Sequence, residues 1–503
     1  MFNKIFKRVT KPKENKPSQN MVKTTKTVDA DLNKTMVAFK AIYNYPTNSD
    51  VSIRTFRLGH SNTEAAIFFI DTITNTDIID NYIMNPLLFK HDPSKNIEDV
   101  IPVKSFAKVT AIKEVISEIN SGQVALFMNG KPEAFIINAI DFQKREIGKA
   151  ENEVVLKGPK EAFSEAAETN ISLIRKQIRD ENLIVESSTI SKRSKNDLFI
   201  IYNKNLANEE LIDELKRRVK NIDAGSIQNL PILEQYIEDR PTSLFPSMLY
   251  TERPDRATHF LENGFIVLLM DNSPDALILP TTFWTHFHSV EDSYLRFIDG
   301  NFTRILRLIA VFVTLFTSAI YVALTEYHSE MIPPDLLLAI ASTRDKVPFP
   351  PVIEILVMEV AFELIREAGL KVPAPIGPTI GIVGALILGQ AAVEANIVSP
   401  IVVIVVALGG LSSFAIGDIS LNFAVRLIRL VMIVSASLFG VYGIMASFTM
   451  GLFYIVSLTS FGVPYFAPFI PNHTPSKDTV FRKLIQNEKF RPGYIKPKDI
   501  TKK

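Results

Sequence analysis

The spacing of charged residues divides the chain into two unlike halves. Charged and apolar positions are interspersed before residue 307, whereas long uncharged runs are concentrated after it. Four uncharged runs of 18, 22, 23 and 47 residues follow one another: Leu308–Thr325, Val372–Val393, Ala395–Gly417 and Leu430–Ser476. The first part of the last run, to about Ser457, is continuous enough for a tilted spanning helix. About 20 apolar residues in a helix cross the ~30 Å hydrocarbon core of a bilayer. The pattern therefore predicts an all-α, multi-pass membrane domain over residues 301–475.

Charges outside these runs predict the orientation of the chain. Met1–Thr35 is basic, with nine lysines or arginines and no apolar signal-peptide core, which favours a disordered tail over residues 1–35. Residues 326–371 carry eight acids against four bases, and residues 477–503 carry nine bases against three acids. The positive-inside rule then places the soluble region and the basic tail 476–503 in the cytoplasm, with about four crossings. This arrangement puts Arg426 and Arg429 outside, against the same rule.

The stretch from Val372 to Gly417 is broken in its middle by Glu394, Asn396 and Pro400. A broken helix at membrane depth is tolerated where its freed backbone groups face protein or a water-filled cavity. Before the break, small residues recur every four positions and allow helices to approach closely: Gly377, Gly381, Ala385 and Gly389.

Gln390 and Glu394 share a face next to this stripe of small residues. One interpretation is a packing stripe with a glutamate at the water boundary. The alternative is an element that lines an ion path, because ionisable groups within membranes are costly and usually functional.

A second unusual segment is Val352–Glu367. At 100° per residue Glu359, Glu363 and Glu367 fall along one face with Arg366 beside them, opposite an apolar side. Three prolines just before the segment prevent its extension backwards. Such a helix either lies flat in the interface or stands in an oligomer with its carboxylates facing a vestibule.

Residues 36–300 have the alternating and clustered apolar segments of an α/β or α+β region. The predicted strands are Ser52–Phe56, Ala66–Ile70, Gln123–Met128, Ala134–Asn138, Leu183–Glu186, Leu198–Tyr202, Phe265–Met270 and Ala276–Leu279. The predicted amphipathic helices are Lys108–Asn120, Asn170–Arg179 and Glu209–Lys220.

Two parts of this region resemble each other. Residues 128–136 (MNGKPEAFI) match residues 270–278 (MDNSPDALI), both typical of a strand, a tight turn and a strand. Residues 51–69 and 183–201 share a strand–loop–strand pattern, and residues 77–80 (DIID) match 210–213 (ELID). Because the three matches occur in the same order, we expect two similar tandem subdomains, 36–150 and 151–300.

Composition argues against several functions. With 55 basic and 54 acidic residues, the chain lacks the positive excess of a nucleic-acid binder. The absence of cysteine excludes disulfides and thiolate chemistry. No GxSxG, HExxH, P-loop or strand-to-helix GxGxxG motif occurs, so we expect neither enzyme activity nor a cofactor.

Two charged motifs have ordinary interpretations. His286 and His288 would point the same way on a strand and could share a metal, although a wet segment next to the membrane, with Trp284 at the interface, is the favoured interpretation. Residues 251–256 (TERPDR) are expected to form an exposed, salt-bridged loop that contributes little to stability, with a role in coupling to the membrane as the alternative.

Several motifs together resemble the A subunits of GerA-family spore germinant receptors, over roughly residues 40–470. They are Thr251-Glu-Arg-Pro-Asp255, Val347-Pro-Phe-Pro-Pro351, Glu363-Leu-Ile-Arg-Glu-Ala-Gly369, Gly389-Gln-Ala-Ala-Val-Glu-Ala-Asn396 and Thr459-Ser-Phe-Gly462, with Leu156-Lys-Gly-Pro-Lys160 followed by Ile174-Arg175. A paralogous stage V sporulation membrane protein shares the same architecture.

The resemblance implies a protein of the inner membrane of bacterial spores that responds to nutrients together with a permease-like B subunit and a lipoprotein C subunit. It also implies a homo-oligomer, by resemblance a pentamer, that forms an ion channel releasing cations from the spore core. The residues placed on or near the pore are Gln390, Val393, Glu394, Asn396, Glu359 and Glu363. A secondary transporter and a non-conducting scaffold are the alternatives, although no second copy of the Gly377–Asn396 pattern supports the inverted repeats of a transporter.

Overall fold

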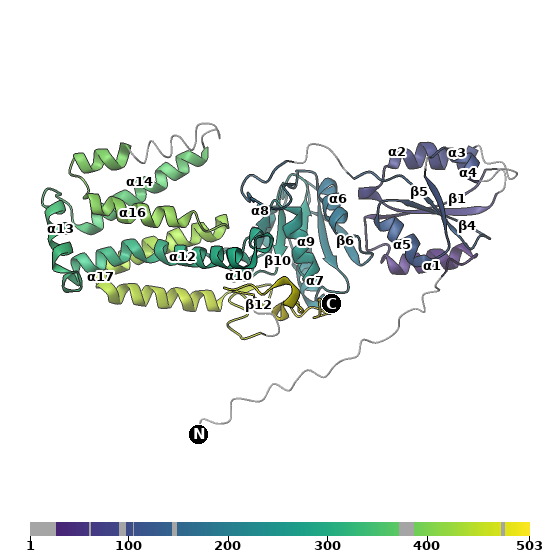
Figure 1. The fold of residues 1–503 in the computed structure, drawn as a ribbon. Coiled ribbons are helices and arrows are strands. Elements are labelled where there is room, and N and C mark those ends of the chain that lie inside the picture. Colours follow the sequence, from purple (N-terminus) through teal and green to yellow (C-terminus); the bar gives the residue numbers. More distant parts are fainter. Residues whose placement is uncertain are drawn as a thin grey trace, which may run out of the picture. The chain divides into compact units, whose positions relative to one another are not determined.

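The computed structural model describes residues 27–59, 62–89, 97–103, 105–142, 148–371, 387–473 and 478–502. They form two compact units (Figure 1). The first contains the chain up to Tyr45 and Val51–Ile140, and the second contains Pro46–Asp50 and the chain from Asp141 onwards. Two of the predicted small residues, Gly377 and Gly381, lie outside the described residues, as does Ala385.

The first unit is an antiparallel sheet with strand order β1-β2-β4-β5-β3 and helices on both faces. Its strands are β1 (Val51–Arg57), β2 (Glu64–Ile70), β3 (Phe106–Val109), β4 (Val124–Met128) and β5 (Ala134–Ile137). Its helices are α1 (Leu32–Ile42) and α5 (Ile112–Asn120) on one face, and α2 (Thr76–Ile78), the π-helical η2 (Ile79–Met84), α3 (Asn85–Phe89) and α4 (Ile97–Val100) on the other. Alternate residues of β2 face the two layers. Phe68 contacts Phe39 of α1, with ring centroids 5.5 Å apart, whereas Ile67 packs with Ile83 of η2.

The second unit begins with a sheet of the order β6-β7-β9-β10-β8, again antiparallel. Its strands are β6 (Leu183–Ile190), β7 (Asn196–Asn203), β8 (Leu249–Thr251), β9 (Ile266–Met270) and β10 (Ala276–Leu279). Helices α6 (Ala167–Gln177) and α9 (Pro254–Glu262) cover one face, and α7 (Glu209–Lys220) and α8 (Leu230–Ile237) cover the other.

The two sheets share more than their strand order. In both, the third strand in sequence lies at the edge and is followed by a helix, α5 or α9, that leads into the central hairpin. Each of these helices ends at a glycine in the left-handed region, Gly122 (φ 92°) or Gly264 (φ 91°), whose amide donates to Ile119 or Leu261. This is a common helix C-cap, and glycine adopts it without steric cost. The division into two similar tandem subdomains stays a prediction.

All eight predicted strands are confirmed, and α7 has the predicted bounds. The predicted helix Lys108–Asn120 is wrong at its start, because Phe106–Val109 forms the edge strand β3. Strand β8 was also missed, since three residues give no readable alternation. Helix α1 begins at Leu32, within the range predicted as a tail.

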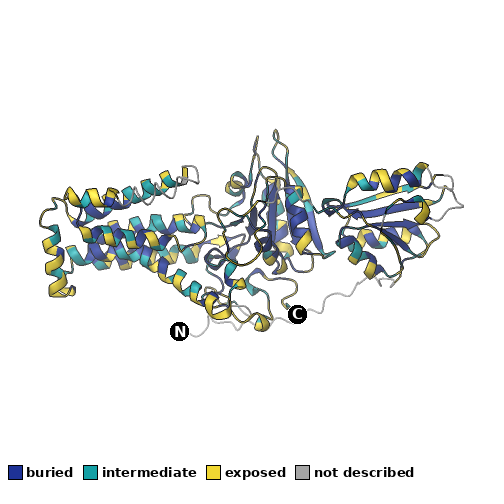
Figure 2. Ribbon diagram, turned by 45° about the horizontal axis from the view of Figure 1, so that its top comes forward, coloured by how far each residue is buried: buried dark blue, intermediate teal, exposed yellow. Residues whose placement is uncertain are grey.

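A helical region follows the second sheet. It comprises α10 (Phe283–Phe287), α11 (Glu291–Tyr294), α12 (Phe297–Glu326), α13 (Pro334–Arg344), α14 (Pro351–Lys371), helical residues 387–394, α16 (Pro400–Ser413) and α17 (Ile419–Ser457). Among the described helices, α12 and α17 are long and apolar enough to cross a membrane. Figure 2 shows exposed positions along these helices, and large apolar side chains such as Phe312, Phe439 and Phe453 occupy many of them. Exposed apolar surface of this extent is typical of contact with lipid or other chains.

Helix α17 folds back on itself. Gly440 has non-helical backbone angles (φ 59°, ψ −139°). The Ser447 hydroxyl contacts Met432 Sδ at 2.8 Å, although residues 15 apart in a straight helix would be roughly 22 Å apart. Residues 419–439 and 441–457 are therefore two antiparallel helices, and the prediction of one tilted helix to Ser457 is wrong. A glycine in an apolar run allows such a turn without a charged or proline signal.

The uncharged run Ala395–Gly417 also differs from a simple span. Residues 387–394 are helical, Asn396 adopts φ 51°, and the next helix, α16, has 14 residues and begins at Pro400 with Ser399 as its N-cap. The predicted break at Asn396 and Pro400 is thus present, because proline starts a helix well but cannot continue one. Most of the preceding run, residues 372–386, lies outside the described residues.

The end of the helical region returns to the second sheet. Strands β11 (Thr459–Ser460) and β12 (Val463–Pro464) follow α17, and Ser460 accepts a hydrogen bond from Thr281 at 3.1 Å. The basic tail packs on the same body: Arg482 N donates to Asn301, and Lys498 ion-pairs with Glu209 at 2.7 Å. Both ends of the helical region are therefore attached to the second sheet and its linker.

Candidate functional site

Helices α14 and α17 meet at a group of charges inside the helical bundle, of which Glu359 and Arg429 are buried and the others half-buried. We call Glu359, Glu363, Arg366, Arg426 and Arg429 the bundle cluster. Arg429 Nη2 lies 2.5 Å from Glu359 Oε2 and 3.4 Å from Glu363 Oε1, and Arg426 Nη1 lies 2.5 Å from Glu363 Oε2. Ser318 of α12 also donates to Glu359, at 2.9 Å. Arg426 and Arg429, which the predicted topology places on the non-cytoplasmic side, are thus partners of the α14 glutamates.

Small residues make room for the arginines of the bundle cluster. A Cβ atom at Gly409 would lie 3.4 Å from Arg429 Nη1, and Arg366 donates to the Gly410 carbonyl (3.2 Å) and Ser413 hydroxyl (2.7 Å). Both acceptors lie near the C-terminal end of α16, where positive charge is stabilised.

The bundle cluster is incomplete as a network. It contains three arginines and two glutamates, which leaves a formal excess of one positive charge. Among the described residues, four buried guanidinium nitrogens have no hydrogen-bond partner. They are Nη1 of Arg366, Nε of Arg426, and both Nε and Nη1 of Arg429. Burying unpaired guanidinium groups costs free energy, so this arrangement is less stable than a fully paired one.

The other α14 glutamates are also paired. Glu354, fully buried, accepts from Arg344 Nε at 3.1 Å and from the Ser399 amide at 2.8 Å, and Glu367 pairs with Lys371 at 2.8 Å. The structure thus gives each α14 carboxylate a cationic partner.

Glu394 has different surroundings. It is exposed at the end of helical residues 387–394, where its Oε1 accepts a hydrogen bond from Gln390 at 3.0 Å. Within the described ranges it has no ion pair with a lysine or arginine. Asn396 is also exposed, while Val393 packs partly against the bundle core and Gly389 is buried. Of the predicted pore residues, Gln390, Glu394 and Asn396 are therefore brought together on an exposed segment. Glu359, which is buried, and Glu363, which is half-buried, lie in the bundle cluster.

A second group of buried charges joins the second sheet to α12. We call Glu153, Arg253, Asp255, Arg256 and Asp292 the joint cluster. The guanidinium group of Arg253 donates two hydrogen bonds, of 3.1 and 2.7 Å, to the Asp255 carboxylate, and Arg253 is only 1% exposed. The prediction of an exposed loop at residues 251–256 is therefore wrong. Sequence could not show that carbonyls from residues 153 and 159 would receive the remaining Arg253 donors.

The joint cluster extends to the first turns of α12. Arg256 ion-pairs with Glu153 and donates to the carbonyls of residues 285 and 288. Asp292 accepts from Arg304 and Arg307 of α12, both at 3.1 Å. Burial alone would raise the pKa of Asp292, but hydrogen bonding to Arg307 and the charges of both arginines lower it. The sheet and the membrane-directed helix are thus joined through charge-assisted hydrogen bonds.

The two histidines point to different partners. His286 Nδ1 lies 3.2 Å from Asp418, the N-cap of α17, and His288 bonds to the Thr479 carbonyl of the tail. Burial, with the charge of Arg304, lowers the pKa of His288 to about 4. Among the described residues no group of three or more histidine, aspartate or glutamate side chains is placed to hold a metal ion.

A large sheet-containing region joined to a helical bundle with two candidate spans defines a membrane-associated protein. The family model described as Bacillus/Clostridium GerA spore germination protein matches residues 38–494. The chain belongs to this family, as the sequence motifs predicted.

Individual relatives agree with the family assignment. The chain is 36% identical to Spore germination protein KA of Bacillus subtilis, covering 90% of this chain and 85% of that protein. It is 34% identical to Spore germination protein B1 (94% and 99%) and 38% identical to Spore germination protein A1 (78% and 80%), both of B. subtilis. The chain is also similar to the crystal structure of the N-terminal domain of the A subunit of the Bacillus megaterium spore germinant receptor GerK3. The sequences are 26% identical, the match covers 52% of this chain and 98% of the GerK3 domain, and the TM-score is 0.39.

Proposed function

We propose that this protein is the A subunit of a nutrient receptor in the inner spore membrane and that its oligomer forms a cation channel. The proposal includes tandem sheet subdomains on the core side, and permease-like and lipoprotein partner subunits. Relatives named as spore germination proteins support the role in germination. A role in conduction is supported by one observation of the structure: Glu394 is exposed and unpaired with a base among the described residues, whereas every α14 glutamate has such a partner.

This difference decides between the candidate pore residues. A carboxylate paired with arginine offers little net charge to a passing cation, whereas an unpaired carboxylate repeated around a symmetry axis attracts cations. We therefore assign the water-facing role to Gln390, Glu394 and Asn396, and a gating or supporting role to Glu359 and Glu363. A pentameric ring would bring five copies of Glu394 towards one axis, as the resemblance implies.

Both ends of the helical region attach to the second sheet and its linker, which supports an even number of crossings. Helix α14 is 21 residues long, roughly 31 Å, and α17 contributes two helices. With α12, these helices account for four crossings, and we therefore propose four, made by α12, α14 and the two helices of α17. The chain contains no cysteine, so single introduced cysteines report sidedness directly. Labelling of Tyr327→Cys from the side opposite to Asp478→Cys is the expected result, and labelling of both from the same side would contradict it.

The test of conduction is Glu394→Gln in spores, with nutrient-triggered potassium efflux as the readout. Removing the charge is expected to slow efflux by roughly tenfold or more, since even a partly desolvated carboxylate contributes over 1 kcal/mol to cation binding. Glu367→Gln, an exposed glutamate on α14, is the matched control and should leave efflux near the original rate. Unchanged efflux at normal protein levels in Glu394→Gln would remove this residue from the mechanism.

Reconstitution separates the remaining functions. Single-channel currents from the purified protein in bilayers support the channel. Saturable exchange of substrate without unitary currents would instead indicate a secondary transporter. Electrical silence in the presence of the partner subunits would indicate a scaffold.

A further inference from the structure

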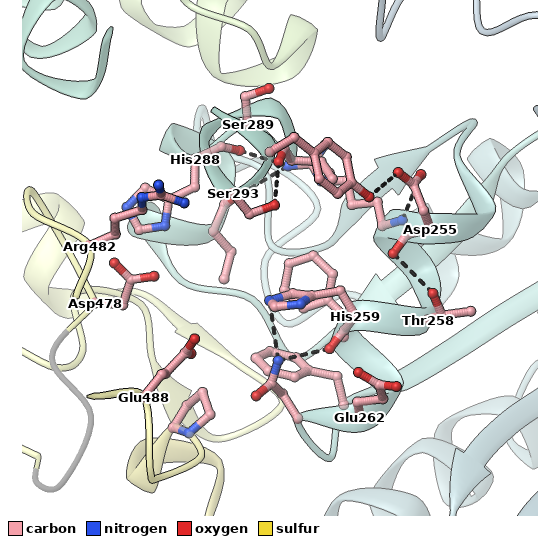
Figure 3. A pocket seen from close by; sticks show the side chains of 18 of the residues that line it. Asp255, Thr258, His259, Glu262, His288, Ser289, Ser293, Asp478, Arg482 and Glu488 are labelled. Atoms are coloured by element: carbon pink, nitrogen blue, oxygen red, sulfur yellow. Dashed lines mark hydrogen bonds between the residues drawn. The ribbon is translucent and has the colours of Figure 1, made fainter. Parts of the chain in front are cut away.

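A cavity of about 440 Å³ lies beside the joint cluster (Figure 3). Its walls come from α9, the α10–α11 linker, the start of α12 and the C-terminal tail. In Figure 3, Arg482 and His288 lie on one side of the hollow, and His259 and Glu262 lie on the other. The volume suits a small organic molecule.

Two of its wall residues carry donors without acceptors. Arg482 is 9% exposed and donates Nη2 to the Leu295 carbonyl at 2.8 Å, but its Nε and Nη1 have no partner among the described residues. Trp284 is 6% exposed, and its indole nitrogen Nε1 likewise has no partner there. Buried N–H groups are nearly always hydrogen-bonded in native proteins, so three such atoms beside one cavity point to a missing acceptor.

Three of the four carboxylates along the cavity wall are engaged, and the fourth, Glu262, is exposed at the end of α9. Asp478 pairs with Arg304 at 2.6 Å, Asp255 with Arg253 at 2.7 Å, and Glu488 with Lys502 at 2.6 Å. Among the described residues, none of these carboxylates pairs with the Arg482 or Trp284 donors, which are therefore open to an acceptor from a bound molecule. A guanidinium fork matches the two oxygens of a carboxylate.

The rest of the wall is rich in rings, contributed by Phe260, Phe265, Tyr294, Tyr494, His259 and His288. Burial lowers the pKa of both histidines, so these rings are neutral near pH 7 and add no competing charge. Flat surfaces of this kind pack well against a planar ring.

We propose that this cavity binds a small aromatic carboxylate, whose oxygens accept hydrogen bonds from Arg482 and Trp284 and whose ring packs among the aromatic side chains. The site is independent of the channel function, because it lies between the sheet, the linker and the tail. A bound ligand there would hold the tail, α9 and the start of α12 together.

The experiment uses the full-length protein in detergent micelles and benzoate as the probe. Trp284 is the single tryptophan of the chain, so its fluorescence reports this cavity without interference. Benzoate is expected to change the fluorescence saturably. Cyclohexanecarboxylate, which has the same charge and no planar ring, and benzyl alcohol, which has the ring and no charge, should bind at least about tenfold more weakly.

Arg482→Gln removes the fork and is expected to raise the Kd of benzoate about tenfold or more, whereas Lys489→Gln, an exposed residue of the same tail, should leave it unchanged. Arg482→Lys serves as a second variant if Arg482→Gln unfolds, and it should bind with intermediate strength. Equal Kd values for the original protein, Arg482→Gln and Lys489→Gln, or a linear response to benzoate, would overturn the site. Equal binding of cyclohexanecarboxylate would overturn its aromatic character. No outcome depends on ion flow, so the channel proposal stands or falls separately.

Discussion

The two buried charge groups of this protein differ in completeness. In the joint cluster, Arg253 and Arg256 direct their donors at carboxylates and backbone carbonyls, and among the described residues no fully buried nitrogen of either side chain is left without a partner. In the bundle cluster, four guanidinium nitrogens are left without one. By these definitions the joint cluster has one excess carboxylate and the bundle cluster one excess arginine, so the two differ in hydrogen-bond pairing and in the sign of the excess charge.

This difference indicates different mechanical roles. A fully paired buried network fixes one geometry, because any displacement leaves a charge uncompensated. An incompletely paired network already contains uncompensated buried donors. A rearrangement of its partners therefore loses little stability and can gain hydrogen bonds. We infer that the joint between the second sheet and α12 moves as a rigid body, and that α14 and α17 are where the bundle can change its packing.

The most severe test of the rigid joint is Arg253→Ala. This change leaves Asp255 buried with only Tyr294 and the Arg256 amide as donors, and we expect a loss of roughly 3–5 kcal/mol in unfolding free energy. Denaturant unfolding of the full-length protein in micelles, followed by Trp284 fluorescence, measures it. The matched control is Arg57→Ala, whose pair with Glu64 is exposed and should be worth at most about 1 kcal/mol. Similar losses of unfolding free energy for both variants would mean that the Arg253–Asp255 pair is exposed to solvent.

The bundle cluster predicts an asymmetry between removing an acid and removing a base. Glu363→Gln increases the positive excess, and we expect it to cost roughly 2 kcal/mol, because Arg426 loses its carboxylate partner and Arg429 keeps only Glu359. Arg366→Met restores the charge balance, and we expect it to cost about 1 kcal/mol or less. Thermal unfolding of both variants, compared with the original protein at equal detergent concentration, gives the two losses. A greater loss for Arg366→Met would show that the excess charge has a partner within the assembled protein.

Sequence patterns predicted the elements of this protein better than its charged sites. Alternating apolar residues indicated all eight strands, and uncharged runs indicated α12 and the second half of α17, because both signals depend on local periodicity. The turn at Gly440 carries no local signal beyond one glycine among several. The pairing of Glu363 with Arg426, 63 residues apart, is set by how two helices pack, and spacing along the chain cannot reveal it. Arg253 was read as exposed for the same reason, since its acceptors come from a distant loop.

The smallest expected effect is the dependence of the unfolding free energy on pH, which tests whether water is excluded from the joint at His288. His288 is buried beside Arg304, Asp292 and Asp478, its carbonyl accepts from Arg256, and its pKa is lowered to about 4. The unfolded chain has an ordinary histidine pKa near 6.5, so it binds the proton first as the pH falls. The stability that neutral His288 contributes is therefore complete above pH 6.5 and is lost between about pH 6.5 and 4, by at most about 3 kcal/mol.

A second buried group changes the unfolding free energy in the opposite direction. Burial raises the pKa of Glu234 to about 7, so its contribution to stability increases as the pH falls from about 7 to 4.5, and a variant is needed to separate it from that of His288. His288→Gln retains a donor for the Thr479 carbonyl without the titration, and the difference in unfolding free energy between it and the original protein should shrink steadily from pH 7 to pH 4. A difference that stays constant over this range would mean that His288 is solvated, and the joint would then be open to water at the point where the tail meets α12.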